Sequence, residues 1–230
     1  MKVTYIEHSS FLIEFESAYF LFDYFEGVLP TMNEDKEVFI FVSHRHQDHF
    51  SWKIFSLFPK HKVTYILAYD IDKNYNKKYF LKKKVKEEVY EDILFVKART
   101  QYERNALRIE TLLSTDEGVA FIIHYEGKDI YHAGDLNLWC WKEESDQYNQ
   151  KMIIDYQKEI KHIENRHFDV AFVVLDPRQE EDFYLGFDYF MKHTHTDIVY
   201  PMHMWGDHTV IDALLQKEES SLYRKKIQKI

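Results

Sequence analysis

The 230-residue sequence contains one cysteine, Cys140, so no disulfide can form within the chain, as is usual in a reducing compartment. It has only four prolines and six glycines, and no stretch has the composition of an interdomain linker. No apolar run approaches the roughly 20 residues of a membrane span, and the first ten residues lack the apolar core of a secretory signal peptide. We therefore expect one cytoplasmic domain, residues 1–230, without a membrane partner.

The chain also lacks an excess of basic charge, because its formal net charge is −9. Nucleic-acid surfaces concentrate Lys and Arg to neutralise phosphates, so this balance argues against a nucleic-acid partner and favours a small-molecule substrate. The lysine-rich run at 77–86 is interpreted as a solvated surface segment. A homo-oligomer is left open.

Short apolar runs rich in aromatic and β-branched residues predict strands along much of the sequence. A meander of three strands is expected at 2–8, 11–15 and 19–25, and buried strands are expected at 37–43 and 63–68. A second strand-rich block spans 93–134, with a hairpin turn at Glu126–Lys128. Helical spacing predicts helices at 51–58, with Ser51 as N-cap, and at 146–165, 183–192 and 209–217. Two strand-rich blocks joined to helices predict an α+β fold in which helices flank two packed sheets.

The motif FVSHRHQDHF, residues 41–50, places four potential metal ligands within six residues after an apolar strand. Alternate side chains of an extended segment share a face, so His44 and His46 point the same way as they leave the strand. Asp48 and His49 follow where the chain turns toward a helix. The motif therefore offers two adjacent ligand pairs for one or two cations, and Asp48 could also accept a proton. The alternative, a crowded polar loop, would lack partners elsewhere in the chain.

Such partners are present, and the HxHxDH motif resembles the signature of metallo-β-lactamase-fold hydrolases. Asp23, at the end of YFLFD, resembles the aspartate that orients the histidine ligands in that family. Asp135 in YHAGD resembles the carboxylate that bridges two cations, and His203 in YPMHMWGD resembles the last histidine ligand. The resemblance implies a four-layer αββα sandwich of two mixed sheets. It is strongest to short members related to ascorbate-6-phosphate lactonase, whose N-terminal histidine motif is similar to HSSFLIE at His8.

One histidine of that family pattern is missing, because the loop before the strand at 118–127 reads LLSTDEG. Either Asp116 replaces the imidazole beside His44 and His46, with Thr115 or Glu117 as weaker candidates, or His8 contributes from another side, or only the second metal position is filled. The resemblance assigns Asp48, His49 and His203 to that second position, with Asp135 shared. A carboxylate in place of an imidazole would shift the preference from zinc toward manganese or iron.

The resemblance implies one or two divalent ions, zinc first, with manganese, iron or nickel as alternatives. A metal lowers the pKa of bound water toward neutrality, so we expect a hydrolase that cleaves a small ester, such as a sugar lactone, with Asp48 as the catalytic residue. A phosphodiesterase of the same fold and a non-catalytic metal-binding or ligand-binding protein are the alternatives. His8, Asp23, Thr115 and Arg178 are expected behind the ligands or in the pocket, where Arg178 could hold an anionic group or form a structural ion pair.

Overall fold

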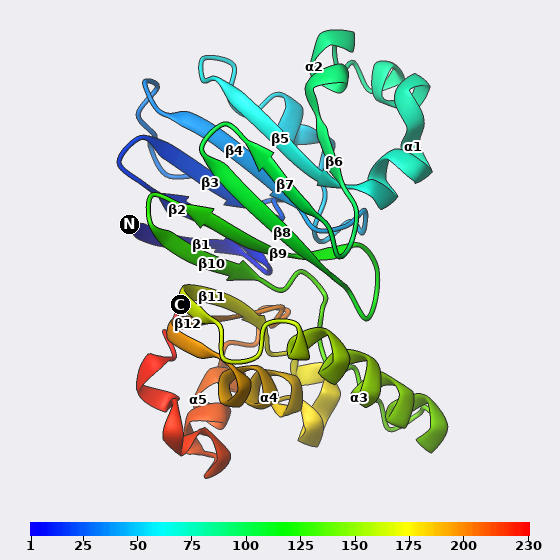
Figure 1. Ribbon diagram of the computed structural model, residues 1–230, viewed down its shortest axis with the longest axis vertical. Helices are drawn as coiled ribbons and strands as arrows, with labels where there is room; N and C mark the ends of the chain where they lie inside the picture. The colour runs from blue at the N-terminus through cyan, green and yellow to red at the C-terminus, as the bar shows by residue number, and fades with distance from the viewer. The chain divides into compact units, whose positions relative to one another are not determined.

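The computed structural model describes all residues 1–230, which form two compact units (Figure 1). The N-terminal unit is Met1–Lys97 and the C-terminal unit is Ala98–Ile230. Each unit contains one six-stranded sheet with both parallel and antiparallel neighbours, together with helices. The predicted α+β class with two mixed sheets flanked by helices is therefore confirmed.

The N-terminal sheet follows chain order from edge to edge. Its first three strands form the predicted antiparallel meander, and the next three add in parallel. The strands are β1 (Lys2–Glu7), β2 (Ser10–Glu14), β3 (Ala18–Phe22), β4 (Glu37–Val42), β5 (Val63–Ala68) and β6 (Leu94–Val96).

Strands β3 and β4 are almost wholly buried, as their continuous apolar sequences predict. Their aromatic side chains pack against one another, with the rings of Phe22 and Phe41 stacked at 4.8 Å. Because the two strands are parallel, their carboxyl ends lie at the same edge of the sheet. The polar residues that follow each strand are thereby brought together, which is the feature of this unit that positions the site.

The helices of the N-terminal unit are short and partly irregular. The helix predicted after Ser51 is only a 3₁₀ turn, η1 (Trp52–Phe55), although the Ser51 side chain caps it as expected by accepting a hydrogen bond from the Lys53 backbone. The longer α1 (Tyr69–Lys82) and the short α2 (Glu87–Asp92) were not predicted. The buried residues of α1 are Ile71 and Phe80, too few to produce a helical period in the sequence.

The C-terminal sheet begins with four antiparallel strands, β7 (Gln101–Arg104), β8 (Leu107–Leu113), β9 (Val119–Tyr125) and β10 (Lys128–His132). Strands β11 (His167–Val174) and β12 (His195–Met202) then add in parallel beside β10. The turn between β9 and β10 has positive φ at both Glu126 and Gly127, the conformation of a tight hairpin turn, as predicted.

The helices of the C-terminal unit lie toward the β10–β11–β12 side of its sheet (Figure 1). Helix α4 packs against β11 and β12 and against α3. Helix α3 is four residues shorter than predicted and starts at the side-chain cap of Ser145. The helices and 3₁₀ turns are α3 (Asp146–Lys161), η2 (Pro177–Asp182), α4 (Leu185–His193), α5 (Thr209–Gln216), η3 (Glu219–Leu222) and η4 (Arg224–Lys226).

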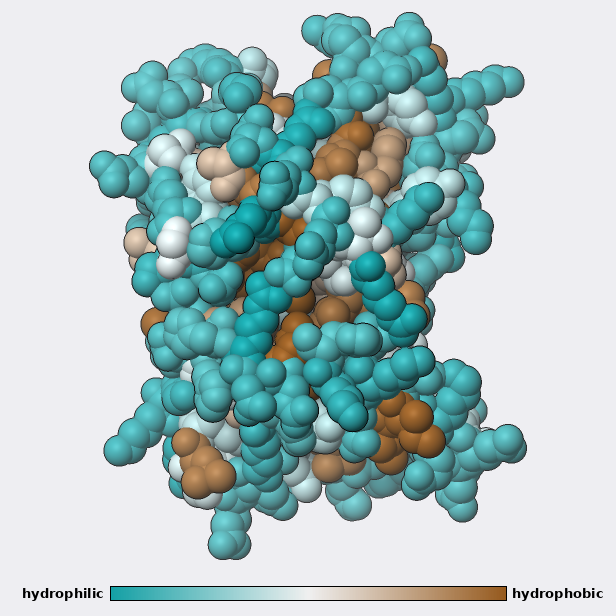
Figure 2. All heavy atoms as spheres, in the orientation of Figure 1, coloured by the Kyte–Doolittle hydropathy of each residue, from teal (hydrophilic) through white to brown (hydrophobic).

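None of the helices combines the length and the apolar character needed to traverse a lipid bilayer. Polar and charged residues cover most of the face shown in Figure 2, and apolar residues are interspersed among them.

Candidate metal centre

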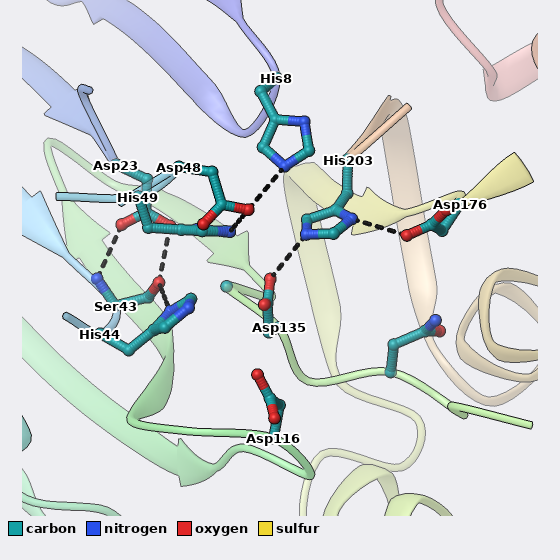
Figure 3. Close-up of polar contacts among 12 residues, drawn as sticks. His8, Asp23, Ser43, His44, Asp48, His49, Asp116, Asp135, Asp176 and His203 are labelled. Atoms are coloured by element: carbon teal, nitrogen blue, oxygen red, sulfur yellow. Dashed lines mark hydrogen bonds and ion pairs between the residues drawn. The ribbon is translucent and has the colours of Figure 1, made fainter. Parts of the chain in front are cut away.

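In the N-terminal unit the site is built where β3 and β4 end. Asp23 follows β3 and Ser43 follows β4, and both are completely buried. One carboxylate oxygen of Asp23 accepts from the Ser43 backbone N–H at 2.7 Å, and the other accepts from the Ser43 hydroxyl at 2.7 Å. The Asp23 carboxylate therefore fixes the start of the HxHxDH segment to the neighbouring strand (Figure 3).

Hydrogen bonds also set which ring nitrogen of two buried histidines faces a metal. His49 Nδ1 lies 2.8 Å from Asp23 Oδ2, so this nitrogen donates to the carboxylate. The Ser43 hydroxyl donates its only proton to Asp23. Its oxygen, 2.9 Å from His44 Nδ1, therefore accepts a hydrogen bond from that nitrogen. With the proton of each ring on Nδ1, the Nε2 lone pair is the one that binds a metal.

The turn after His46 brings the remaining ligand candidates together. The carbonyl of His46 accepts from the backbone N–H groups of His49 and Phe50 at 3.1 and 2.9 Å. The rings of His44 and His46 are edge-to-face at 4.6 Å. His8, Asp48 and His49 each offer a ligand atom within 4.8 Å of the others. Within this unit the potential donors thus lie in two groups, His44 with His46 and His8 with Asp48 and His49.

In the C-terminal unit His203 and Asp176 follow the adjacent parallel strands β12 and β11. His203 Nδ1 lies 2.9 Å from Asp176 Oδ2, and His203 Nε2 lies 3.4 Å from Asp135 Oδ1 (Figure 3). Burial raises the pKa of the Asp176 carboxyl, but hydrogen bonds from His203 and Arg178 outweigh it and hold that pKa below its usual value. The ionised carboxylate therefore orients His203 as Asp23 orients His49.

Four residues in or beside these donor groups have the left-handed backbone conformation that side chains other than glycine rarely adopt. They are His8 (φ 54°), Asp23 (φ 42°), His203 (φ 67°) and Trp205 (φ 53°). Such residues cost about 1–3 kcal/mol each and concentrate at functional sites. Of the ten residues other than glycine with positive φ, four therefore lie in or beside these donor groups.

Asp116, predicted as the substitute for the missing histidine, lies in an exposed loop of the same unit as Asp135. The two carboxylates offer oxygens within 4.8 Å of one another. Thr115 links the loops that carry them, because its hydroxyl donates to the Asn137 carbonyl at 2.6 Å and accepts from the Asn137 N–H at 3.1 Å. Thr115 therefore positions the two loops.

Arg178 pairs with Asp176 through Nε, 3.0 Å from each carboxylate oxygen, and through Nη2. Its guanidinium also lies over the rings of Trp205 and Trp141, at 4.6 and 5.8 Å from their centroids. Its side chain is 48% exposed. The structural ion pair expected as one of two alternatives is present, and the half-exposed guanidinium still has donors for an anionic group.

The loop after Asp135 is held by close packing against Gly186 of α4. A Cβ atom at Gly186 would lie 2.0 Å from Asn137 Oδ1 and 3.0 Å from the Leu138 nitrogen. We expect Gly186→Ala to lower the free energy of unfolding by about 1–3 kcal/mol through overpacking. Because the indole N–H of Trp139 in the same loop donates to the Asp135 carbonyl, the near-ultraviolet circular dichroism of Trp139 should change as well. Chemical denaturation measures the first effect, and a loss below about 0.5 kcal/mol, ordinary for surface substitutions, would contradict this account.

Two residues of the site were not given their roles by sequence reasoning. Ser43 connects Asp23 to His44, and Asp176 orients His203. A signal for Asp176 exists, because VVLD ends a buried strand with an aspartate just as YFLFD does at Asp23. Ser43 carries no comparable signal, since serine at a strand end is common in turns.

The donors present fit a divalent metal. The Nδ1 atoms of three buried histidines, His44, His49 and His203, are held by a hydroxyl or a carboxylate. Nε2 of His49 and of His203 also lies near a carboxylate of its own unit, at 3.8 and 3.4 Å. This is the usual arrangement around metal-binding histidines. The mixture of imidazole and carboxylate suits zinc, manganese, iron or nickel.

The chain matches the family described as Beta-lactamase superfamily domain over residues 2–155 and belongs to that family. Its fold resembles that of a protein described as a metal-dependent hydrolase from Parabacteroides distasonis (TM-score 0.61, 15% identity, covering 98% of this chain and 90% of that one). It also resembles a metallo hydrolase from the archaeon Ignicoccus hospitalis (TM-score 0.60, 16% identity, 99% and 94%). A diiron β-hydroxylase from Streptomyces venezuelae shares the fold over 88% of this chain and 44% of its own (TM-score 0.55, 12% identity).

No curated protein sequence matches the chain significantly. The predicted class, the metallo-β-lactamase superfamily with its metal-dependent hydrolases, is confirmed at the level of family and fold. The narrower resemblance to ascorbate-6-phosphate lactonase stays a prediction.

Proposed function

We propose that the chain is a metal-dependent hydrolase of small esters, with a sugar lactone as the preferred substrate class. Following the resemblance, we propose as metal ligands His44, His46, Asp48 and His49 in the N-terminal unit and Asp135 and His203 in the C-terminal unit. Asp116 completes the set in place of the missing histidine. The observation that carries the proposal is the pairing of His49 with Asp23 and of His203 with Asp176, each at hydrogen-bond distance through Nδ1.

The residues of the chain then have distinct tasks. A divalent ion at this centre supplies a water activated near neutral pH and polarises the oxygen that gains charge. Asp48 accepts the proton of the attacking water and delivers it to the leaving alkoxide oxygen. Its half-buried carboxylate lies beside His8 and His49 in the same unit, which keeps it in place for this transfer.

Arg178 is proposed to contact substrate, because its side chain is half exposed and its Nε and Nη2 atoms already hold the carboxylate that orients His203. The neighbouring Trp141 and Trp205 would face the apolar side of a substrate ring. These features support a small polar ring compound as the substrate, in agreement with the acidic net charge of the chain. We propose that residues 1–230 act as a single functional domain.

The chain isolated without added metal is expected to contain close to two divalent ions per molecule, zinc first. Asp116→Ala should lower this ratio toward one, because the metal position that Asp116 is proposed to complete would then retain only the imidazoles of His44 and His46 as its own ligands. Elemental analysis of both proteins measures the ratio, and Glu143→Ala, which removes an exposed carboxylate of the same unit, is the matched control. An unchanged metal-to-chain ratio in Asp116→Ala would show that this carboxylate is not a metal ligand.

Activity is tested with the metal-replete chain on a panel of sugar lactones, simple aryl esters and phosphodiesters. Turnover of lactones ahead of phosphodiesters is the expected result. Preferred cleavage of phosphodiesters would instead identify the chain as a phosphodiesterase of the same fold. Metal binding without turnover of any compound would replace the hydrolase proposal by a non-catalytic metal-binding one.

A further inference from the structure

His8 occupies the turn between β1 and β2 in an unusual backbone conformation. Its φ is 54°, and the pairing of β1 with β2 is irregular just before it, between Tyr5 and Glu7. The His8 N–H donates to the Tyr5 hydroxyl oxygen at 2.8 Å. Burial and the nearby Glu7 carboxylate raise the pKa of Tyr5 to about 12, so this oxygen stays a neutral phenol. The strained turn is therefore held in place by a specific contact.

The His8 ring is buried like those of His44 and His49, with a side-chain exposure of 4%. It packs edge-to-face against the rings of Phe25 and His49, at 6.1 and 5.7 Å. Its Nε2 atom points toward Asp48 (Figure 3). Burying a polar atom at this depth is costly unless a partner compensates for the loss of water, and the Asp48 carboxylate lies close to this nitrogen.

The distance between His8 Nε2 and Asp48 Oδ2 is 3.4 Å, and that between His49 Nε2 and the same oxygen is 3.8 Å. Both are longer than an ordinary N–H···O hydrogen bond of about 2.7–3.2 Å. Two donors that each lie about 2.0–2.2 Å from a tetrahedral ion are separated by about 3.3–3.5 Å. The His8–Asp48 distance matches that separation, as does the 3.4 Å between His203 and Asp135, whereas the His49–Asp48 distance exceeds it by about 0.3 Å.

We infer that His8 is a metal ligand, and that its Nε2 binds the same ion as Asp48 and His49. The inference rests on the proposed metal centre and changes its composition. The N-terminal unit alone then supplies two imidazoles and a carboxylate to this position, while His44 and His46 belong to the other. His8 therefore does not stand in for the missing histidine. The position it joins is rich in nitrogen, which favours zinc over manganese.

The test uses the full chain loaded with Co²⁺, whose visible absorption depends on the number and kind of donors. His8→Ala and His8→Gln are expected to weaken the binding of one ion at least about 100-fold. Loss of a residue that only hydrogen-bonds to a ligand typically weakens metal binding by about 10–100-fold. The absorption band of that ion should change as well. The control is His61→Ala, which removes another partly buried imidazole of the same unit.

A structural role for His8 would give a different result. In that case the two variants would lower the thermal stability of the metal-free chain while Co²⁺ affinity and absorption stayed as in the unsubstituted protein, and the inference would be overturned. Co²⁺ bound normally by a chain that hydrolyses nothing would refute only the proposed activity. A chain that binds no Co²⁺ would refute both.

Discussion

Asp48→Asn is expected to lower kcat/KM for lactone or ester hydrolysis by about 10³-fold or more. Asparagine has nearly the same shape, but it carries no negative charge for a cation and cannot take a proton from water. The loss of a positioned general base alone costs about 10²–10⁴-fold, and the weaker ligand adds to it. Measured kinetics with the preferred substrate, together with metal content, separate the two contributions.

Asp35→Asn makes the same chemical change at an exposed position of the N-terminal unit and should leave the kinetics unchanged. If Asp48→Asn kept its metal and lost less than about tenfold in kcat/KM, Asp48 would be a ligand of minor importance and another group would have to accept the proton.

The elements of the fold that could be predicted are those whose sequence carries a burial pattern. The continuous apolar runs of β4 and β5 and the hairpin turn at Glu126–Gly127 were predicted because burial on both faces and positive φ each leave a composition signal. Strand β7 falls within the strand-rich block at 93–134 but was not recognised as a separate strand, because its sequence, QYER, is polar and only partly buried. Helix α1 was missed for a related reason, since lysines on its exposed surface mask the two buried side chains.

Some residues of the candidate site could be predicted from their spacing in the sequence, whereas others could be recognised only in the folded structure. The HxHxDH spacing is local, so His44, His46, Asp48 and His49 could be found directly in the sequence. Asp135 and His203 came from a resemblance. The hydrogen bonds of Ser43 and Asp176 and the approach of His8 to Asp48 depend on strand register and on a strained turn, which no spacing encodes.

Asp23 is the residue whose replacement should affect metal binding most without removing a ligand. Its carboxylate accepts from the Ser43 backbone, the Ser43 hydroxyl and His49 Nδ1, all within 2.8 Å. Asp23→Ala would leave these buried donors without their acceptor. Removing one partner of a buried charged network costs about 3–5 kcal/mol, so chemical denaturation of the metal-free chain should show a loss of this size.

Asp23→Asn separates orientation of the ligand from stability of the fold. The amide oxygen can still accept from the Ser43 backbone, but the amide NH₂ then faces His49 Nδ1 and forces the ring proton to Nε2, where it blocks the metal. We expect this variant to lose at least about 100-fold in metal affinity, at the upper end of effects from groups behind the ligands, while losing less stability than Asp23→Ala. Competition with a chelator measures the affinity. Asp176→Asn should act in the same way through His203, and equal metal affinity of Asp23→Asn and the unsubstituted chain would show that Asp23 serves the fold alone.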